Sequence, residues 1–82
     1  MDIGIVVFED VEELDFAGPW EVLGAWAERF PDDGVTLRLL AAGTTAPIRC
    51  RKGLRVIPDA VLADASDLDV VLVPGGQAPG GR

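Results

Sequence analysis

An aspartate placed between two large apolar side chains is the first candidate for chemistry in this chain. It is Asp15, in the run Leu14-Asp15-Phe16-Ala17-Gly18-Pro19. A carboxyl group that is partly withdrawn from water can give or take a proton near neutral pH, because burial disfavours its charged form. Two plainer interpretations stay open: Asp15 caps the helix that follows, or it faces solvent as one of several acids in this stretch.

The second candidate is a pair of glycines, Gly75 and Gly76, which follows the apolar run Asp69–Val73 and Pro74. Glycines let the backbone turn sharply and leave its N–H groups open to an incoming oxygen. The alternative is an ordinary turn. Neither Gly-x-x-x-x-Gly-Lys-Ser/Thr nor Gly-x-Gly-x-x-Gly occurs, so a phosphate-binding loop is disfavoured. We expect an oxyanion-type hydrogen-bond donor instead.

The single cysteine, Cys50, is expected to be a small, half-buried apolar side chain and not a nucleophile. It lies between Arg49 and Arg51, but neighbours on a strand point to opposite faces, so we expect no activation of its thiol. One cysteine excludes an internal disulfide and a Cys-cluster metal site. Histidine, the commonest general base and metal ligand, does not occur. We therefore expect neither a metal nor a cofactor.

A pair of acids after the first apolar run, Glu9 and Asp10, is similar to the metal-binding pair of phosphorylation receiver domains. Those domains also need an aspartate at the end of their third parallel strand. Here the corresponding run ends in Val73-Pro74, so this interpretation is rejected.

Composition indicates a globular chain, because 49% of its 82 residues are hydrophobic. The formal net charge of −7 disfavours binding of nucleic acid by this segment. Four of the seven bases (Arg49, Arg51, Lys52 and Arg55) cluster, and we interpret them as a solvated turn. No apolar run approaches the roughly 20 residues that span a bilayer. The acidic start, Met1-Asp2, is unlike a signal peptide, so we expect a cytoplasmic protein without membrane contact.

The elements that must position these residues are an α/β set. Ile3–Phe8 and Asp69–Val73 are apolar on both alternating faces, which is typical of interior strands of a parallel sheet. We predict that they lie side by side, parallel, at the centre of the sheet. A helix is predicted to begin at Pro19 and to stop at Phe30-Pro31-Asp32-Asp33-Gly34. Val35–Ala41 is the second predicted strand.

The rest of the chain is predicted to contain smaller elements. Pro47–Cys50 and Leu54–Ile57 are expected to form two short strands or one bent excursion of the chain, and Val61–Ala65 about one helical turn. A parallel sheet that is apolar on both faces needs helices on both faces, and only one full helix is predicted. We therefore expect an incomplete domain, which by itself is poorly stable or associates through the uncovered face.

In combination these segments resemble the ThiJ/PfpI superfamily, the class I glutamine-amidotransferase-like fold. The resemblance rests on four stretches: Ile3–Phe8, Leu14–Leu23, Gly53–Asp59 and Asp69–Gly76. The form Asp-x-x-Gly-Pro-x-x-Val-Leu in the second is similar to isonitrile hydratases and to the sensor half of AraC-type regulators. It implies a flavodoxin-like, three-layer parallel sheet, of which residues 1–82 are the N-terminal part.

The resemblance also implies roles for individual residues. Asp15 matches the family's acid, which contacts a nucleophilic cysteine and handles a proton. The backbone N–H of Gly76, with Gly75 in the same loop, matches the oxyanion donor. The family's cysteine follows this loop and is not within the 82 residues, and Cys50 lies upstream of it.

The implied parent activity is hydration of a small carbon–nitrogen substrate, such as an isonitrile. Two alternatives stay open: a ligand-sensing domain of an AraC-type transcriptional regulator, and an inactive fragment. The expected partners are a small-molecule substrate or ligand and, in a full-length form, a second copy in a homodimer.

Overall fold

The computed structural model describes residues 1–75, and four of their strands form one parallel sheet. These strands are β1 (Asp2–Val7), β2 (Thr36–Ala41), β5 (Ala60–Val61) and β6 (Val70–Leu72). Their order across the sheet is β5-β2-β1-β6, and every neighbouring pair is parallel. The predicted parallel α/β architecture is therefore confirmed.

The pairing of β1 with β6 confirms that the two apolar runs lie side by side. Gly4 is opposite Val71, and Ile5 is opposite Leu72. The prediction that both runs are central is wrong for this chain, because β6 has one neighbour among the described strands and stands at the sheet edge. An apolar run predicts that a strand becomes covered, but it does not say by which segment.

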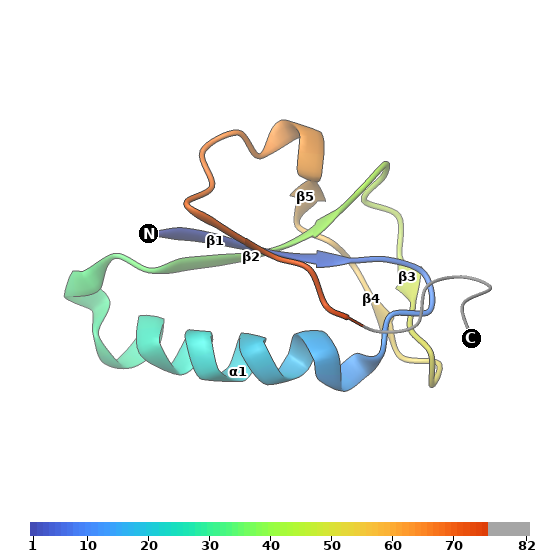
Figure 1. Ribbon diagram of the computed structural model, residues 1–82, viewed down its shortest axis with the longest axis horizontal. Coiled ribbons are helices and arrows are strands. Elements are labelled where there is room, and N and C mark those ends of the chain that lie inside the picture. Colours follow the sequence, from blue (N-terminus) through green and yellow to red (C-terminus); the bar gives the residue numbers. More distant parts are fainter. Residues whose placement is uncertain (76–82) are drawn as a thin grey trace.

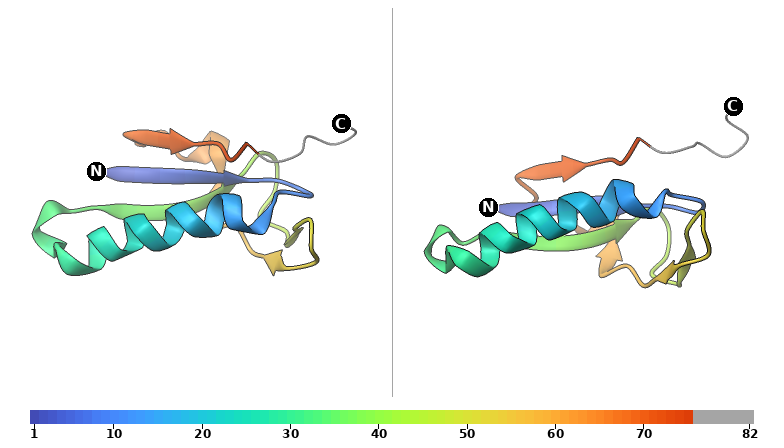
Figure 2. Two further views of the ribbon diagram at one scale, coloured as in Figure 1. Left: turned by 60° about the horizontal axis from the view of Figure 1, so that its bottom comes forward. Right: turned by 90° about the horizontal axis from the view of Figure 1, so that it is seen from below.

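The helix α1 (Glu13–Arg29) covers one face of the sheet. It lies across β1 and β2, whereas β6 lies to one side of it (Figure 2). Ile3, Ile5 and Val7 are between 0% and 3% exposed. Alternate residues of a strand point to one face, so these three form the α1-facing row. Burial of each such side chain contributes about 1.5–3 kcal/mol to the free energy of unfolding.

The opposite face is covered only in part. The segment that contains η2 (Leu62–Asp64) crosses above it (Figure 1). This cover comes close to Gly4, because a Cβ placed on Gly4 would lie 3.0 Å from Leu68 Cδ1. The same Cβ would lie 2.5 Å from Cδ1 of Leu40, which is in the neighbouring strand β2. Toward the edge the cover ends, and Val71 and Val73 are 46% and 67% exposed.

The predicted start of the helix is wrong by six residues: α1 begins at Glu13, and Pro19 lies inside it. Proline fits the first turn of a helix well, which is why the sequence pointed to residue 19. The acidic first turn, with Glu13 and Asp15, instead favours the earlier start, because carboxylates are stabilised by the positive end of the helix dipole.

The helix ends where the sequence predicts. Phe30 is the C-terminal cap, and its N–H donates to the Trp26 carbonyl at 2.9 Å. The short η1 (Pro31–Asp33) follows, and Gly34 adopts φ +68°. Glycine tolerates this left-handed conformation without strain. Phe30 itself is 59% exposed, so it is not part of the buried helix face.

The two short predicted strands are also confirmed, as an antiparallel pair of β3 (Ile48–Arg49) and β4 (Arg55–Val56). The η2 turn lies where one helical turn was predicted. The strand β5, which has only two residues, was not predicted. Asp59 precedes it and is hydrogen-bonded twice to the backbone of Leu39. The Asp59 N–H donates to the Leu39 carbonyl, and the Asp59 carboxylate accepts from the Leu39 N–H.

Candidate active site at the carboxyl edge of the sheet

The two loops that carry the candidate residues leave neighbouring parallel strands. Because β1 and β6 run in the same direction, the segments that follow Val7 and Leu72 begin at the same edge of the sheet. Ligands of open parallel sheets bind at this edge. Asp15 follows β1, and Gly75 follows β6. Gly76 lies outside the described residues.

Asp15 is the third residue of α1, and its N–H donates to the Glu12 carbonyl at 3.0 Å. The helix cap is Glu12, so the interpretation of Asp15 as the cap residue is wrong. Its flanking side chains point in opposite directions: Phe16 is 5% exposed and Leu14 is 73% exposed. Asp15 is half-buried between them. A carboxylate here lies at the positive end of the helix dipole.

Gly75 is exposed, and a Cβ placed on it would meet no atom within 4 Å. Its φ lies outside the left-handed region, because the glycines with positive φ in the described chain are Gly34 and Gly53. The backbone at Gly75 therefore does not adopt the left-handed conformation that only glycine tolerates well.

Cys50 is 1% exposed and belongs to the hydrophobic core. Burial raises the pKa of its thiol, and the negative charges of Glu13 and Glu9 raise it further. A nucleophilic thiol needs the opposite environment, in which a cation or a helix N-terminus stabilises the thiolate. The geometry thus agrees with the expectation that Cys50 is a packing residue.

The acidic pair that is similar to a receiver-domain metal site is engaged in structural contacts. Glu9 Oε2 accepts a bond from Arg49 N at 3.3 Å, and Asp10 N donates to the Arg49 carbonyl at 3.0 Å. Asp10 adopts φ +69°, which turns the chain from β1 toward α1. Within residues 1–75, no group of three or more His, Cys, Asp or Glu side chains could hold a metal ion.

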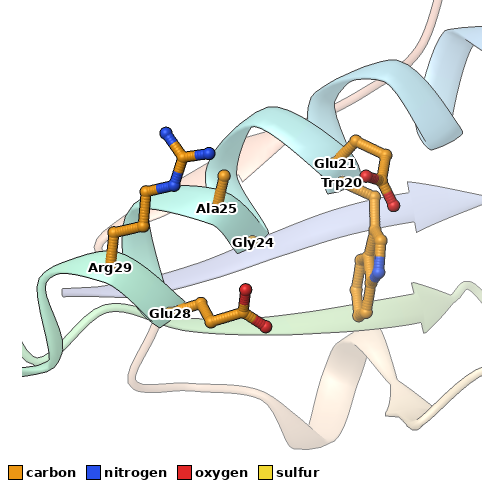
Figure 3. A pocket seen from close by; sticks show the side chains of 6 residues that line it. All are labelled: Trp20, Glu21, Gly24, Ala25, Glu28 and Arg29. Carbon is orange, nitrogen blue, oxygen red and sulfur yellow. The ribbon is translucent and has the colours of Figure 1, made fainter.

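Two of the hollows on the described surface include neither Asp15 nor Gly75 in their lining. One of about 310 Å³ lies at the carboxyl ends of β1 and β2, between Phe8, the loop from Ala42 to Pro47, and Ile48. The other, of about 340 Å³, lies on α1 around Gly24, with Trp20 and Glu28 on either side (Figure 3). The second is remote from the strand ends and forms no part of the candidate site.

The basic cluster is a solvated turn, as predicted. Arg51, Lys52 and Gly53 connect β3 to β4 and are exposed. The link between this turn and α1 was not predicted from the sequence. Glu13 accepts hydrogen bonds from Lys52 N and Leu54 N, about 40 positions along the chain. No local pattern signals a pairing at this separation.

The fold and this edge site define an α/β protein of the flavodoxin-like class. Residues 1–81 match the family model described as the DJ-1/PfpI family. The chain therefore belongs to the DJ-1/PfpI family. This match confirms the resemblance that the sequence motifs indicated. Among the described residues, no helix has the length and apolar content to cross a membrane.

Two curated relatives are similar over most of the chain. The isonitrile hydratase of Pseudomonas putida is 34% identical over 80 residues, which are 98% of this chain and 32% of the relative. The glutathione-independent glyoxalase DJR-1.2 of Caenorhabditis elegans is 33% identical over 70 residues, 83% of this chain and 33% of that protein. The chain thus spans about a third of the length of these relatives.

Two solved structures show the same arrangement of strands and helix. A ThiJ/PfpI family protein from Pseudomonas syringae has a TM-score of 0.77 at 25% identity, over 93% of this chain and 29% of that one. An AraC family transcriptional regulator from Pseudomonas putida has a TM-score of 0.76 at 18% identity, over 92% and 46% of the two chains. The second likeness shows the fold alone.

Proposed function

We propose that this chain is the N-terminal part of a DJ-1/PfpI domain that hydrates a small carbon–nitrogen substrate, converting an isonitrile to an N-substituted formamide. The observation that carries the proposal is the 34% identity with an isonitrile hydratase over 98% of the chain. The position of Asp15 supports it, since this acid lies in the first turn of the helix that follows β1, and β1 and β6 end at the same edge of the sheet.

The overall reaction adds one water to the isonitrile. The water oxygen becomes bonded to the terminal carbon, and its two hydrogens end on that carbon and on the nitrogen. Asp15 would exchange the proton, and the backbone N–H of Gly76, with Gly75 beside it, would stabilise the developing negative charge on oxygen. The nucleophilic cysteine would come from sequence beyond residue 82, and the 82 residues alone would show no turnover.

The test uses the protein expressed from its complete open reading frame. The coding DNA past codon 82 is read first, because a cysteine elbow there is required by the proposal. An aliphatic isonitrile is then supplied, and formamide is followed by proton NMR. We expect turnover in the unchanged protein and a loss of roughly 100-fold or more in Asp15→Asn, since general acid–base groups contribute about 10²–10⁴-fold.

The matched control is Asp64→Asn, which removes the same charge from an exposed position on η2. It should keep its activity within about twofold, because exposed charges distant from a site are screened. Equal losses in both variants would contradict a proton-transfer role for Asp15. Turnover by the 82-residue chain that disappears in Cys50→Ser would contradict the placement of the nucleophile.

A ligand-sensing domain of an AraC-type regulator is the second candidate, and the fold shared with such a regulator favours it. A basic helix-turn-helix pair encoded after the domain, with DNA binding that changes on ligand addition, would support it over the enzyme. A 2-oxoaldehyde is included in the activity assay, because a glyoxalase is among the relatives. A homodimer and a cytoplasmic location are further proposals that rest on the family resemblance and the sequence.

A further inference from the structure

The turn between β3 and β4 is held against the start of α1 mainly by the carboxylate of Glu13. Glu13 Oε2 accepts a hydrogen bond from Lys52 N at 2.9 Å and one from Leu54 N at 3.2 Å. Glu13 Oε1 is also 3.2 Å from Lys52 N. Bonds from backbone N–H groups to a carboxylate are stronger than bonds between neutral groups. One side chain therefore fixes two points of a turn that is distant in sequence.

Backbone hydrogen bonds extend the same junction toward β1. Asp10 N donates to the Arg49 carbonyl, and Arg51 N donates to the Val11 carbonyl, each at 3.0 Å. Val11 and Cys50 lie beneath and are 0% and 1% exposed. The hairpin and the helix start thus pack as one unit, and neither can shift without exposing these two side chains.

The helix start needs this outside support, because α1 contains a proline in its second turn. Pro19 has no N–H and cannot make the usual bond to the carbonyl four residues earlier. The cap residue Glu12 makes no side-chain capping bond either. The first turn of α1, which carries both Glu13 and Asp15, therefore has fewer internal bonds than an ordinary helix start.

Backbone hydrogen bonds, together with the Lys52 charge, keep Glu13 in the ionised form that the contacts require. Withdrawal from water alone would raise its pKa. Hydrogen bonds from its own backbone N–H, from Leu54 and from Lys52, together with the Lys52 charge, lower the pKa below its ordinary value. The carboxylates of Glu9 and Glu12 face the same turn, where Glu9 bonds Arg49 N and Glu12 pairs with the Lys52 ammonium.

We propose that Glu13 is a positioning residue, whose carboxylate clamps the β3–β4 turn to α1 and thereby fixes Asp15 at the edge of the sheet. The inference rests on the proposed function, in which Asp15 exchanges the proton. Glu13 touches no reacting atom in this account. It acts through the first helical turn, two residues before the acid.

The first test measures Asp15 directly, in isotopically labelled protein expressed from its complete open reading frame. Amide hydrogen exchange is measured at Asp15, whose N–H donates to the Glu12 carbonyl, in Glu13→Gln and in Glu12→Gln. Both variants remove one negative charge within three residues of Asp15, but only the first removes the clamp. We expect the Asp15 amide to exchange clearly faster in Glu13→Gln than in Glu12→Gln, because the first helical turn then opens more often. Equal exchange rates in both variants would overturn the proposal, because the loss of one charge would then explain the result.

The clamp itself is read from the amide protons of Lys52 and Leu54. In the unchanged protein both should shift with one titration whose midpoint lies below the ordinary value of a glutamate, about 4.3. This titration should disappear in Glu13→Gln and persist in Glu12→Gln. Amides that do not follow Glu13 in the unchanged protein would overturn the proposal without reference to any reaction.

The kinetic test separates positioning from general stability. We expect Glu13→Gln to lower kcat by roughly 10- to 100-fold with KM within about twofold, since small misplacement of a reacting group has effects of this size. Glu12→Gln should stay within about twofold in both constants. Glu13→Asp keeps the charge, but its side chain is one methylene shorter. Its kcat should lie between those of Glu13→Gln and Glu12→Gln. Melting curves show that each variant is folded at the assay temperature. If the unchanged protein hydrates no isonitrile, the proposed function fails, while the amide exchange at Asp15 still decides the positioning role.

Discussion

The strands β1 and β6 have similar apolar sequences but very different surroundings. In β1 the α1-facing residues are almost completely buried, with Ile5 and Val7 at 0% exposure. In and after β6, Val71 and Val73 are 46% and 67% exposed. The difference arises from position, because β1 lies between two strands under α1, whereas β6 is paired on one side only. An apolar sequence therefore shows that a strand needs to be covered, whereas the position of the strand in the sheet determines how far this chain covers it.

The largest effect should come from truncating a side chain in β1. We expect Ile5→Ala to lower the free energy of unfolding by about 2–5 kcal/mol, because it removes buried methyl groups and leaves a cavity in a packed core. The matched change at the edge, Val71→Ala, should lower it by less than about 0.5–1 kcal/mol, since a half-exposed side chain loses little burial. Urea unfolding measures both, and similar losses would show that β6 is as well covered as β1.

A smaller contrast is expected between two glycines, one in each region. Gly4→Ala places a Cβ 2.5 Å from Leu40 Cδ1, and Leu40 is fully buried and has little room to move. We expect a loss of about 1–3 kcal/mol in the free energy of unfolding, as for other overpacked cores. Gly75→Ala meets open space and should change stability by less than about 0.5 kcal/mol.

The thermal midpoint of each glycine variant, measured at one protein concentration, checks this contrast. An unchanged midpoint in Gly4→Ala would mean that the Leu40 and Leu68 side chains around Gly4 are loosely packed. A strong loss in Gly75→Ala would mean that the loop after β6 is held by contacts that the open space around Gly75 does not suggest.

The same contrast explains how far the sequence could predict the fold. Runs that are apolar on both faces, such as Ile3–Phe8, located the long strands, because period-two burial is a strong local signal. Pro19 misplaced the helix start, since proline fits a first turn but is tolerated inside a helix whose start is supported from elsewhere. The strand β5 has only two residues, which is too short for an alternating pattern to be recognised in the sequence.

The candidate site could be predicted only where it depends on strand direction. Two loops that leave parallel neighbours must begin at one edge, so the sequence predicted that the segments that carry Asp15 and Gly75 start at the same edge of the sheet. The Glu13 clamp could not be found in this way, because it joins residues 39 and 41 positions apart through backbone N–H groups that carry no residue-specific signal.

A small effect on stability, but a clear effect on association, is expected at the exposed side of β6. Strand edges with unpaired backbone groups and apolar side chains favour pairing with another chain. We expect the isolated 82-residue chain to form dimers or larger species. Val71→Thr with Val73→Thr should shift it toward monomer, with a change in unfolding free energy below about 1 kcal/mol because both side chains are largely exposed.

Val22→Thr is the matched control for this association, because Val22 is 71% exposed on α1 and equally apolar. Sedimentation velocity over a range of concentrations compares the three chains. If association persists in the β6 double variant but is lost in Val22→Thr, the outer face of α1 is the contact surface and the edge interpretation is wrong. If the unchanged chain is a monodisperse monomer with one sharp melt, the partial cover of β6 is sufficient for a stable fold. The exposed valines would then lie within the few hundred square ångströms of apolar surface that monomeric proteins tolerate.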